Sequence, residues 1–163
     1  MKLIRTFAFT SDEFYDFLES DLLANAAKCT SRPLCVNDIK KGFKYSKHDS
    51  NAHTRIDVTI LDYQRHLHYK SKIKSIGDTI TIEYETRNCE QGLEITFNQH
   101  FESFESTSHN KFMELFSQAV YLGRMTDTLY DIERKIVKRR EGIFDIPEVS
   151  PVEHKWLRKL VSK

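Results

Sequence analysis

Glycine, proline and cysteine are scarce in this chain of 163 residues, and their scarcity excludes several classes of protein. Five scattered glycines leave no glycine-rich loop of the kind that binds the phosphates of a nucleotide. Three cysteines without a Cys-x-x-Cys pair fit reduced thiols better than a disulfide framework or a zinc site. No carboxylate or thiol is placed by the sequence to complete a ligand set with His66, His68 or His100. We therefore expect neither a metal site nor a cofactor, and interpret these histidines as solvated.

A large net charge is also lacking, because 25 basic residues stand against 24 acidic ones. This balance argues against a partner such as nucleic acid or a membrane surface. No run approaches the roughly 20 apolar residues that cross a bilayer, and no signal peptide is visible, so we expect a cytoplasmic protein. No nucleophile-elbow signature is present, which favours a protein that is not an enzyme. Carboxylate pairs that meet only in space leave that question open.

The length and composition of the chain predict one domain with a sizeable core, since 39% of the residues are hydrophobic and 12% are aromatic. Residues 2–9 are β-prone and predict a strand. Thr10 together with Glu13, or Ser11 alone, can then cap a helix that ends near residue 28. The apolar positions of this helix are Phe14, Phe17, Leu18, Leu22 and Ala26. A short second helix is expected at residues 37–41.

Between about residues 43 and 103 the hydrophobic period is two almost throughout, which is typical of strands with one covered face. The alternation predicts strands around residues 43–46, 55–60, 69–74, 80–85 and 93–101. Short polar connections between them favour an antiparallel meander.

Two hairpin registers can be proposed from charge pairing and from the parity of the apolar positions. In the first, a two-residue turn of glycine and aspartate places Lys72 opposite Glu83 on the wet face. In the second, a four-residue loop at residues 89–92 places Arg87 opposite Glu94. In the first hairpin, a slip by one residue would set apolar positions against charged ones. In the second, closing the loop two residues earlier would place Glu85 opposite Glu94, a repulsive pair.

The longest predicted element is a helix over residues 108–141, about 50 Å long, and it is apolar on two sides. Its first stripe contains Phe112, Phe116, Ala119, Gly123, Thr126, Tyr130 and Val137. Its second stripe, spaced as in a coiled-coil seam, contains Leu115, Leu122, Met125, Leu129, Ile132 and Ile136. A helix with two apolar sides needs two partners.

Residues 143–163 are expected to be a linker and an amphipathic C-terminal helix outside a domain of residues 1–142. Ser150, Pro151 and Glu153 form a helix start signal. The helix that follows, to about residue 161, would carry Val152, Trp156 and Leu160 on one face. Because an exposed tryptophan stripe is unfavourable, we expect this helix to dock on its own domain or on a second chain.

The predicted order of strand, helix, short helix, five-stranded meander and long helix is similar to the helix-grip fold of the START and birch-pollen-allergen superfamily. The opening MKLIRTFAFTSDEFYDFL, the KGFKY segment at residues 41–45 and the basic end of the late helix resemble a bacterial family known as domain of unknown function 3284. The resemblance implies an α+β fold in which a curved antiparallel sheet of about six strands packs on the long helix. It also implies a mostly apolar pocket between sheet and helix, and no catalytic residue.

The candidate ligand-binding residues are polar residues at the alternate strand positions that are expected to face the core. They are Tyr69, Ser71, Tyr84 and Gln99, and Tyr45 occupies a similar position on an earlier strand. Each tyrosine can instead lie at a sheet edge with its hydroxyl in solvent. Ala119 and Gly123 are added because small residues on a buried helix face either let the sheet approach closely or leave a void that a ligand could fill.

Two functions of different class follow from these patterns. The leading hypothesis is a non-catalytic module that binds a small apolar or aromatic molecule. The alternative is an interaction or assembly protein with a filled core, in which the second stripe and the tail form the partner interface of a homodimer. The interface residues would be Leu122, Met125, Leu129, Ile132, Ile136 and Trp156. Helix one or the returning tail can cover the same stripe within a monomer.

Overall fold

The computed structural model describes residues 1–30, 32–49, 54–76, 78–102 and 111–142 of the chain. A first strand, β1 (Lys2–Phe7), leads into helix α1 (Ser11–Ala27) and the short 3₁₀ helix η1 (Val36–Asp38). Five strands follow, which are β2 (Lys44–Asp49), β3 (Thr54–Gln64), β4 (His68–Lys74), β5 (Thr79–Cys89) and β6 (Gly92–Phe101). The long helix α2 (Lys111–Arg140) closes the described part of the chain.

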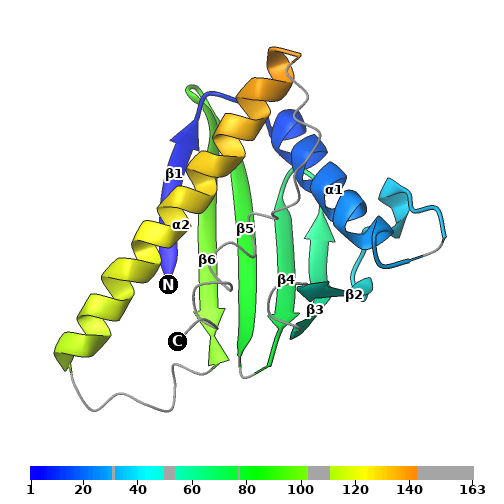
Figure 1. Cartoon of the computed structure of the whole chain (residues 1–163). Coiled ribbons are helices and arrows are strands. Elements are labelled where there is room, and N and C mark those ends of the chain that lie inside the picture. The colour runs from blue at the N-terminus through cyan, green and yellow to red at the C-terminus, as the bar shows by residue number, and fades with distance from the viewer. Residues whose placement is uncertain (31, 50–53, 77, 103–110, 143–163) are drawn as a thin grey trace.

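The strands form one antiparallel, six-stranded sheet in the order β1-β6-β5-β4-β3-β2. The meander is continuous, and β1 adds to its far side by pairing with β6. Both helices lie on one face of the sheet and converge toward the top of the view in Figure 1. The α+β architecture expected from the sequence, with a curved sheet packed on a long late helix, is confirmed. The residues expected to form a second helix make only the single 3₁₀ turn of η1.

Strand pairing arranges the inward-facing side chains of four strands, β6, β5, β4 and β3, into rows across the sheet. The aromatic row consists of Phe97, Tyr84, Tyr69 and Tyr63. The central row consists of Gln99, Ile82, Ser71 and Ile60. The lower row consists of Phe101, Ile80, Ile73 and Val58. Tyr63 joins the aromatic row because a register shift between Ile60 and Asp62 inserts one residue into β3 and reverses the alternation beyond it.

Helix α1 begins at the capping box that the sequence predicts. The Glu13 backbone N–H donates to Thr10 Oγ1 at 3.2 Å, and the Thr10 N–H donates to a Glu13 carboxylate oxygen at 2.7 Å. Phe14 and Tyr15, directly after the cap, are fully buried against the aromatic row. The Phe14 ring lies 5.8 Å from the Tyr84 ring, and the Tyr15 ring 6.2 Å from that of Tyr63.

Among the described side chains of α2, those of the second apolar stripe provide most of the packing on the sheet, whereas those of the first stripe are mostly exposed. Met125, Leu129, Ile132 and Ile136 are all buried in the core. Ala119 and Gly123 lie on the exposed side, and a side chain built on Gly123 would meet open space. Both stripes have helical period, but the second carries far more aliphatic surface where α2 crosses the sheet, so burying it removes more apolar area from water.

The first hairpin pairs two residues away from the predicted register. Ser71 faces Ile82, and Lys70 rather than Lys72 faces Glu83. Four residues connect the strands, and the Ser75 N–H donates to the Asp78 carbonyl oxygen at 2.9 Å. An even shift keeps every side chain on its predicted face, so parity alone could not separate the two registers.

The second hairpin confirms the predicted register. Arg87 lies opposite Glu94, and the pair forms an ion pair at 2.9 Å. Pairing continues to Cys89 and Gly92, which leaves two residues at the tip. Gly92 has a φ of +127°, and a Cβ there would lie 2.1 Å from the Phe7 carbonyl oxygen, so only glycine fits this approach of β1 to the hairpin.

The C-terminal end of α2 is fastened to α1 by two arginines. The Arg140 guanidinium binds both carboxylate oxygens of Glu13 and donates to the Ala8 carbonyl oxygen at 3.0 Å. Arg139 donates to Ser20 Oγ at 3.1 Å, and its guanidinium carbon lies 5.2 Å from the centre of the Phe17 ring. These contacts hold the two helices together at one end.

Replacement of Leu129 by Ala should lower the free energy of unfolding by about 2–5 kcal/mol, because it leaves a cavity in the core. Replacement of Leu122 by Ala on the same helix should cost less than about 1 kcal/mol. The side chains of Leu129 and Leu122 are 1% and 38% exposed, respectively. Urea unfolding followed by circular dichroism measures both, and equal losses would contradict the assigned face of α2.

The ion pair between the helices should make stability depend on pH. The hydrogen bond from Arg140 is the main cause that lowers the pKa of Glu13 from 4.5 to about 2. A depressed carboxyl pKa stabilises the folded state above the unfolded value, and this stabilisation is lost as the pH falls from about 4.5 toward 2. Glu13→Gln should therefore lower the urea midpoint at pH 7, and its difference from wild type should vanish near pH 2. Glu90→Gln, at the exposed tip of a hairpin, is the control that should show no such convergence.

Candidate functional site

The candidate ligand-binding residues of the meander lie together on the inner face of the sheet. Tyr69 and Tyr84 are opposite each other in the aromatic row, and Ser71 and Gln99 belong to the central row directly below. All four are buried within the protein. Tyr45 is also buried, on the edge strand β2. The sequence left open that each tyrosine lies at a sheet edge with its hydroxyl in solvent. The three tyrosines are instead buried in the core.

Ser71 stands out among these residues, because its hydroxyl oxygen is fully buried and has no hydrogen-bond partner within the part of the chain that the structure describes. Its neighbours across the strands are Ile60 and Ile82, and neither side chain can accept or donate a hydrogen bond. A buried hydroxyl without a partner lowers the stability of the folded state by about 1–3 kcal/mol, so such groups are uncommon in the cores of folded proteins. The inner face thus presents one polar atom amid apolar and aromatic side chains.

The helix residues that the sequence assigned to the ligand site and the interface are placed differently. Ala119 and Gly123 are exposed on the outer side of α2 and do not line the inner face. Four proposed interface residues are core residues within one chain, namely Met125, Leu129, Ile132 and Ile136. Leu122 is the one member of that set that is described and exposed, and Trp156 lies outside the described residues.

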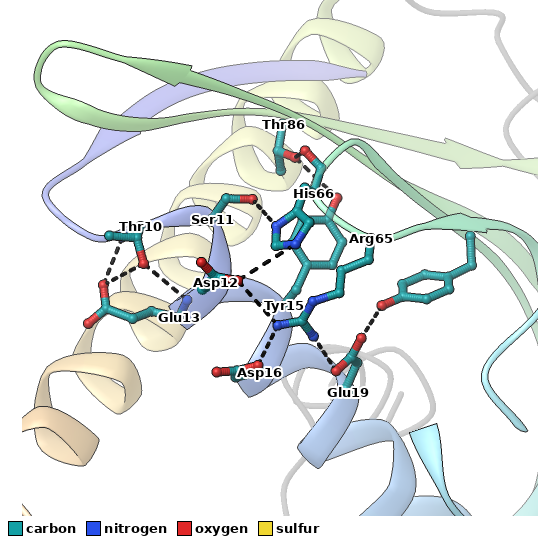
Figure 2. Close-up of polar contacts among 11 residues, drawn as sticks. Thr10, Ser11, Asp12, Glu13, Tyr15, Asp16, Glu19, Arg65, His66 and Thr86 are labelled. Carbon is teal, nitrogen blue, oxygen red and sulfur yellow. Dashed lines mark hydrogen bonds and ion pairs between the residues drawn. The ribbon is translucent and has the colours of Figure 1, made fainter. Parts of the chain in front are cut away.

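A dense group of polar contacts joins α1 to the turn between β3 and β4 (Figure 2). Its centre is Glu19, a carboxylate on the buried side of α1 that is only 4% exposed. Glu19 accepts hydrogen bonds from the Tyr63 hydroxyl and from the Arg65 guanidinium. Arg65 also donates to Asp16 at 2.6 Å and forms an ion pair with Asp12 at 3.5 Å. We call Asp12, Asp16, Glu19, Tyr63 and Arg65 the turn cluster.

The turn cluster perturbs the titration of its own members. Burial, and then the hydrogen bond to Glu19, raises the pKa of Tyr63. The hydrogen bonds to Asp16 and then to Glu19 raise the pKa of Arg65. Tyr63 therefore stays a neutral donor and Arg65 a fixed cation, and both satisfy a carboxylate that would be costly to bury alone.

Beside the turn cluster, a serine, a histidine and an aspartate come close together, as Figure 2 shows. The Ser11 hydroxyl oxygen lies 3.0 Å from His66 Nδ1, and Asp12 Oδ1 lies 3.6 Å from His66 Nε2. Ser11 is only 6% exposed at the start of α1. His66 has a φ of 71°, which is unusual for a residue other than glycine, so these contacts hold a strained turn in place.

The turn is also held from the sheet side. Thr86 Oγ1 donates to the His66 carbonyl oxygen at 2.9 Å and lies 3.1 Å from the Tyr15 hydroxyl. Burial raises the pKa of Tyr15, which keeps that hydroxyl protonated. The group therefore positions the β3–β4 turn over α1 and covers the upper end of the aromatic row.

Sequence reasoning missed this group, although one signal was available. Glu19 shares a helix face with Tyr15 and Leu22, at spacings of four and three residues, so an acidic residue stands among positions expected to be buried. Such a residue predicts a buried cationic partner. The identity of that partner, Arg65, depends on a contact 46 residues away in sequence.

The wet face of the sheet carries a shallow hollow of about 520 Å³. Its lining residues are Met1, Lys2, Leu61, Lys70, Thr81, Glu83, Asn98, Gln99 and His100. Lys70 donates to Glu83 at 3.1 Å, and His68 Nε2 lies 2.9 Å from the same carboxylate oxygen. Burial opposes ionisation of Glu83, but these two hydrogen bonds outweigh it and lower its pKa. The acid is thus already neutralised by its neighbours.

Within the described ranges, no three His, Cys, Asp or Glu side chains are grouped as a metal ion would require. No helix in that part of the chain is long and apolar enough to cross a membrane.

Removal of the cation in the turn cluster should destabilise the fold strongly. Arg65→Met leaves the Glu19 carboxylate buried without a counter-charge and should cost about 3 kcal/mol in urea unfolding. Adding Glu19→Gln should recover part of this loss, because a neutral amide needs no cation. Arg55→Met, which breaks an exposed pair with Asp57, is the matched control and should cost less than about 1 kcal/mol. Equal losses for the two arginines would contradict the structural role of the cluster.

Comparison with solved structures relates the fold to proteins of low sequence identity. The protein of unknown function SA2116 from Staphylococcus aureus is 14% identical, with a TM-score of 0.58, and the match covers 87% of this chain and 94% of that one. Ara h 8.0201 is 9% identical, with a TM-score of 0.56 and coverages of 85% and 97%. DynU16, from the dynemicin biosynthetic locus, is 10% identical with a TM-score of 0.53. That match covers 83% of this chain but 46% of DynU16, so the chain spans about half the length of that protein.

Identities this low show the fold alone, which is the helix-grip α+β fold expected from the sequence. No curated protein matches the sequence. A family model described as a domain of unknown function (DUF3284) matches residues 1–118, which is well over half of the chain. The chain therefore belongs to the DUF3284 family, whose members are grouped by sequence and not by a known activity.

Proposed function

We propose that this protein is a non-catalytic module that binds a small, mainly apolar molecule on the inner face of its sheet. The single observation that carries the proposal is the buried Ser71 hydroxyl, which has no partner within the described residues. A ligand with one hydrogen-bonding group in a mostly apolar body would satisfy that hydroxyl and cover the apolar side chains around it.

The surroundings of Ser71 indicate what kind of molecule would fit. The aromatic row lies directly above it, with the Tyr69 and Tyr84 rings stacked at 6.1 Å and the Tyr84 and Phe97 rings 4.8 Å apart. Gln99 supplies a second polar side chain on the central row. Flat aromatic faces favour a planar or aromatic ligand, oriented by Ser71 and Gln99. In this proposal the module works in the cytoplasm.

The superfamily fold supports this location for the site. In the helix-grip architecture the face of the sheet that meets the late helix is the concave side of the molecule, where a ligand can be enclosed. The outer hollow is the less suitable site, because it is shallow and its acid, Glu83, is already paired with Lys70 and His68.

A second candidate function, assembly of a homodimer, is favoured by exposed apolar side chains on α2. Val120, Leu122, Tyr130 and Val137 each keep more than a third of their surface accessible. They differ from the interface predicted from the sequence, which shares only Leu122 with this set. In this alternative the core is filled and no ligand is bound.

The proposal is tested by native mass spectrometry of the full chain, purified without denaturation. We expect an added mass of one small organic molecule per chain. When that molecule is returned to stripped protein, Ser71→Ala should weaken its binding about fivefold, the value of roughly 1 kcal/mol for one hydrogen bond. The same variant should not reduce stability, because it removes a hydroxyl without a partner.

Thr81→Val on the wet face is the matched control and should leave binding unchanged. If Thr81→Val weakened binding and Ser71→Ala did not, the outer hollow would be the site. An empty dimer that dissociates when Leu122 is replaced by Glu would support assembly instead.

A further inference from the structure

Strand β1 lies at one edge of the sheet, and the pattern of its backbone hydrogen bonds leaves its outer side open. In the sheet it pairs with β6 only. The Met1 nitrogen donates to the Gln99 carbonyl oxygen at 2.6 Å, and the Gln99 N–H donates to the Met1 carbonyl oxygen at 2.8 Å. Bonded and non-bonded pairs alternate along an antiparallel ladder, so every second residue after Met1 is bonded to β6 in the same way. The residues between them direct their N–H and C=O groups away from the sheet, and these are Lys2, Ile4 and Thr6.

With one exception, these outward groups have no hydrogen-bond partner among the described residues. The exception is the Ile4 carbonyl oxygen, which accepts a hydrogen bond from the Arg5 guanidinium at 3.1 Å. The Ile4 side chain is 46% exposed, so it offers apolar surface beside the open edge. An edge of this kind is a template for one more strand, because the main-chain groups of an incoming segment can replace the water bound to it.

The charges along this edge are of one sign. Strand β1 contains Lys2 and Arg5 and no acidic residue. Neither cation forms an ion pair with a carboxylate in the part of the chain that the structure describes. Arg5 is exposed, and its guanidinium reaches the open edge at the Ile4 carbonyl oxygen. Like charges on neighbouring strands are unfavourable, so this edge disfavours a basic strand and favours an acidic one.

A second copy of the same chain does not suit the edge. Pairing β1 with its own copy would bring two Lys2 and two Arg5 side chains together without an acid between them. It would also bring two long helices together, because α2 crosses over β1 in Figure 1 and the Tyr130 ring lies 6.1 Å from that of Phe7. A single extended segment carries no such helix. The occupant that fits is therefore an extended segment of a different protein.

We propose that the open edge of β1 binds an extended, acidic segment of a partner protein as an additional antiparallel strand. Acidic side chains of the segment would face Lys2 and Arg5, and apolar side chains would face Leu3 and Ile4. The open edge lies outside the inner face of the sheet, so this proposal holds whether or not a small molecule binds there.

The exposed side of α2 supports the same occupant. Leu122 and Tyr130 are eight residues apart, about two turns, and they are 38% and 46% exposed, respectively. Because the Tyr130 ring packs on Phe7, this side of the helix is turned toward β1. Apolar side chains on the inner side of the incoming strand would cover part of this surface and remove it from water.

The probe that tests the proposal is a fluorescein-labelled peptide, Val-Thr-Glu-Val-Leu-Glu, designed to run antiparallel from Phe7 to Lys2. Its second valine then faces Ile4, and its first glutamate faces Arg5. Titration with the full chain, followed by fluorescence anisotropy, should show one peptide bound per chain. N-methylation of the second valine removes an N–H that bonds to the edge, so binding should weaken about tenfold. N-methylation of the first glutamate, whose N–H points away from β1, is the matched control and should leave binding nearly unchanged.

Variants of the protein test the same contacts from the other side. Ile4→Pro removes one outward N–H but leaves the bonds to β6, so it should weaken binding about tenfold without changing the circular dichroism. Ile4→Thr keeps that N–H and is the control that should retain most of the binding. Arg5→Glu should bind better to a peptide in which lysine replaces the first glutamate, which reverses the preference of the wild type.

Amide hydrogen exchange followed by NMR locates the bound peptide. The amides of Lys2, Ile4 and Thr6 should become protected, and those of β2, the other edge strand, should not. Equal losses from the two N-methylated peptides would overturn the proposal, as would protection at β2 or the absence of binding. A dimer that the peptide dissociates would also overturn it, because a second copy would then be the occupant. A small molecule on the inner face would leave these amides unprotected, so the two proposals fail separately.

Discussion

The packing of one aliphatic flank of α2 on the sheet is the interaction on which the rest of the structure depends. Met125, Leu129, Ile132 and Ile136 are buried there. Because this flank sets the rotation of α2, it also decides that Ala119 and Gly123 face away from the sheet. The ion pair between Arg140 and Glu13 then fixes where α2 meets α1. The buried flank of α2 and the contact between Arg140 and Glu13 together determine which part of the inner face lies between the helices.

That inner face combines a tightly packed upper part with an unusual middle. Above, α1 and the turn cluster satisfy a buried carboxylate, Glu19, with donors from Tyr63 and Arg65. Below, Ser71 has a buried hydroxyl whose partner is missing from the described residues. One region therefore pairs the carboxylate that it buries, whereas the other buries one hydroxyl that the described residues leave unpaired. This difference within one face separates the structural chemistry of the protein from its candidate binding chemistry.

The sequence predicted local features better than long-range ones, for physical reasons. The cap at Thr10 and Glu13 is formed by residues close together in the sequence, and the alternation of a strand depends only on which of its faces is buried. Both features can therefore be predicted locally, and both predictions are confirmed. The first hairpin was misplaced by two residues because an even shift preserves every face. The expectation that Ala119 and Gly123 lie on a buried face of α2 was wrong, because the two stripes share one period and only the apolar area buried against the sheet separates them. Arg65 was missed because its partners come from a distant helix.

The single inserted residue in β3 has a wider meaning for comparing this chain with its relatives. Before Ile60 the even-numbered positions of the strand face the helices, and after Asp62 the odd-numbered ones do. The bulge thus changes which alternate residues face the helices, and after it Tyr63 points toward α1. A relative that lacks this residue would present the same side chains on both sides of the gap, whereas a relative of equal length with a regular strand would align without a gap and present the opposite set to its interior beyond this point. In this family, the correspondence of positions across β3 has to be counted from the bulge outward.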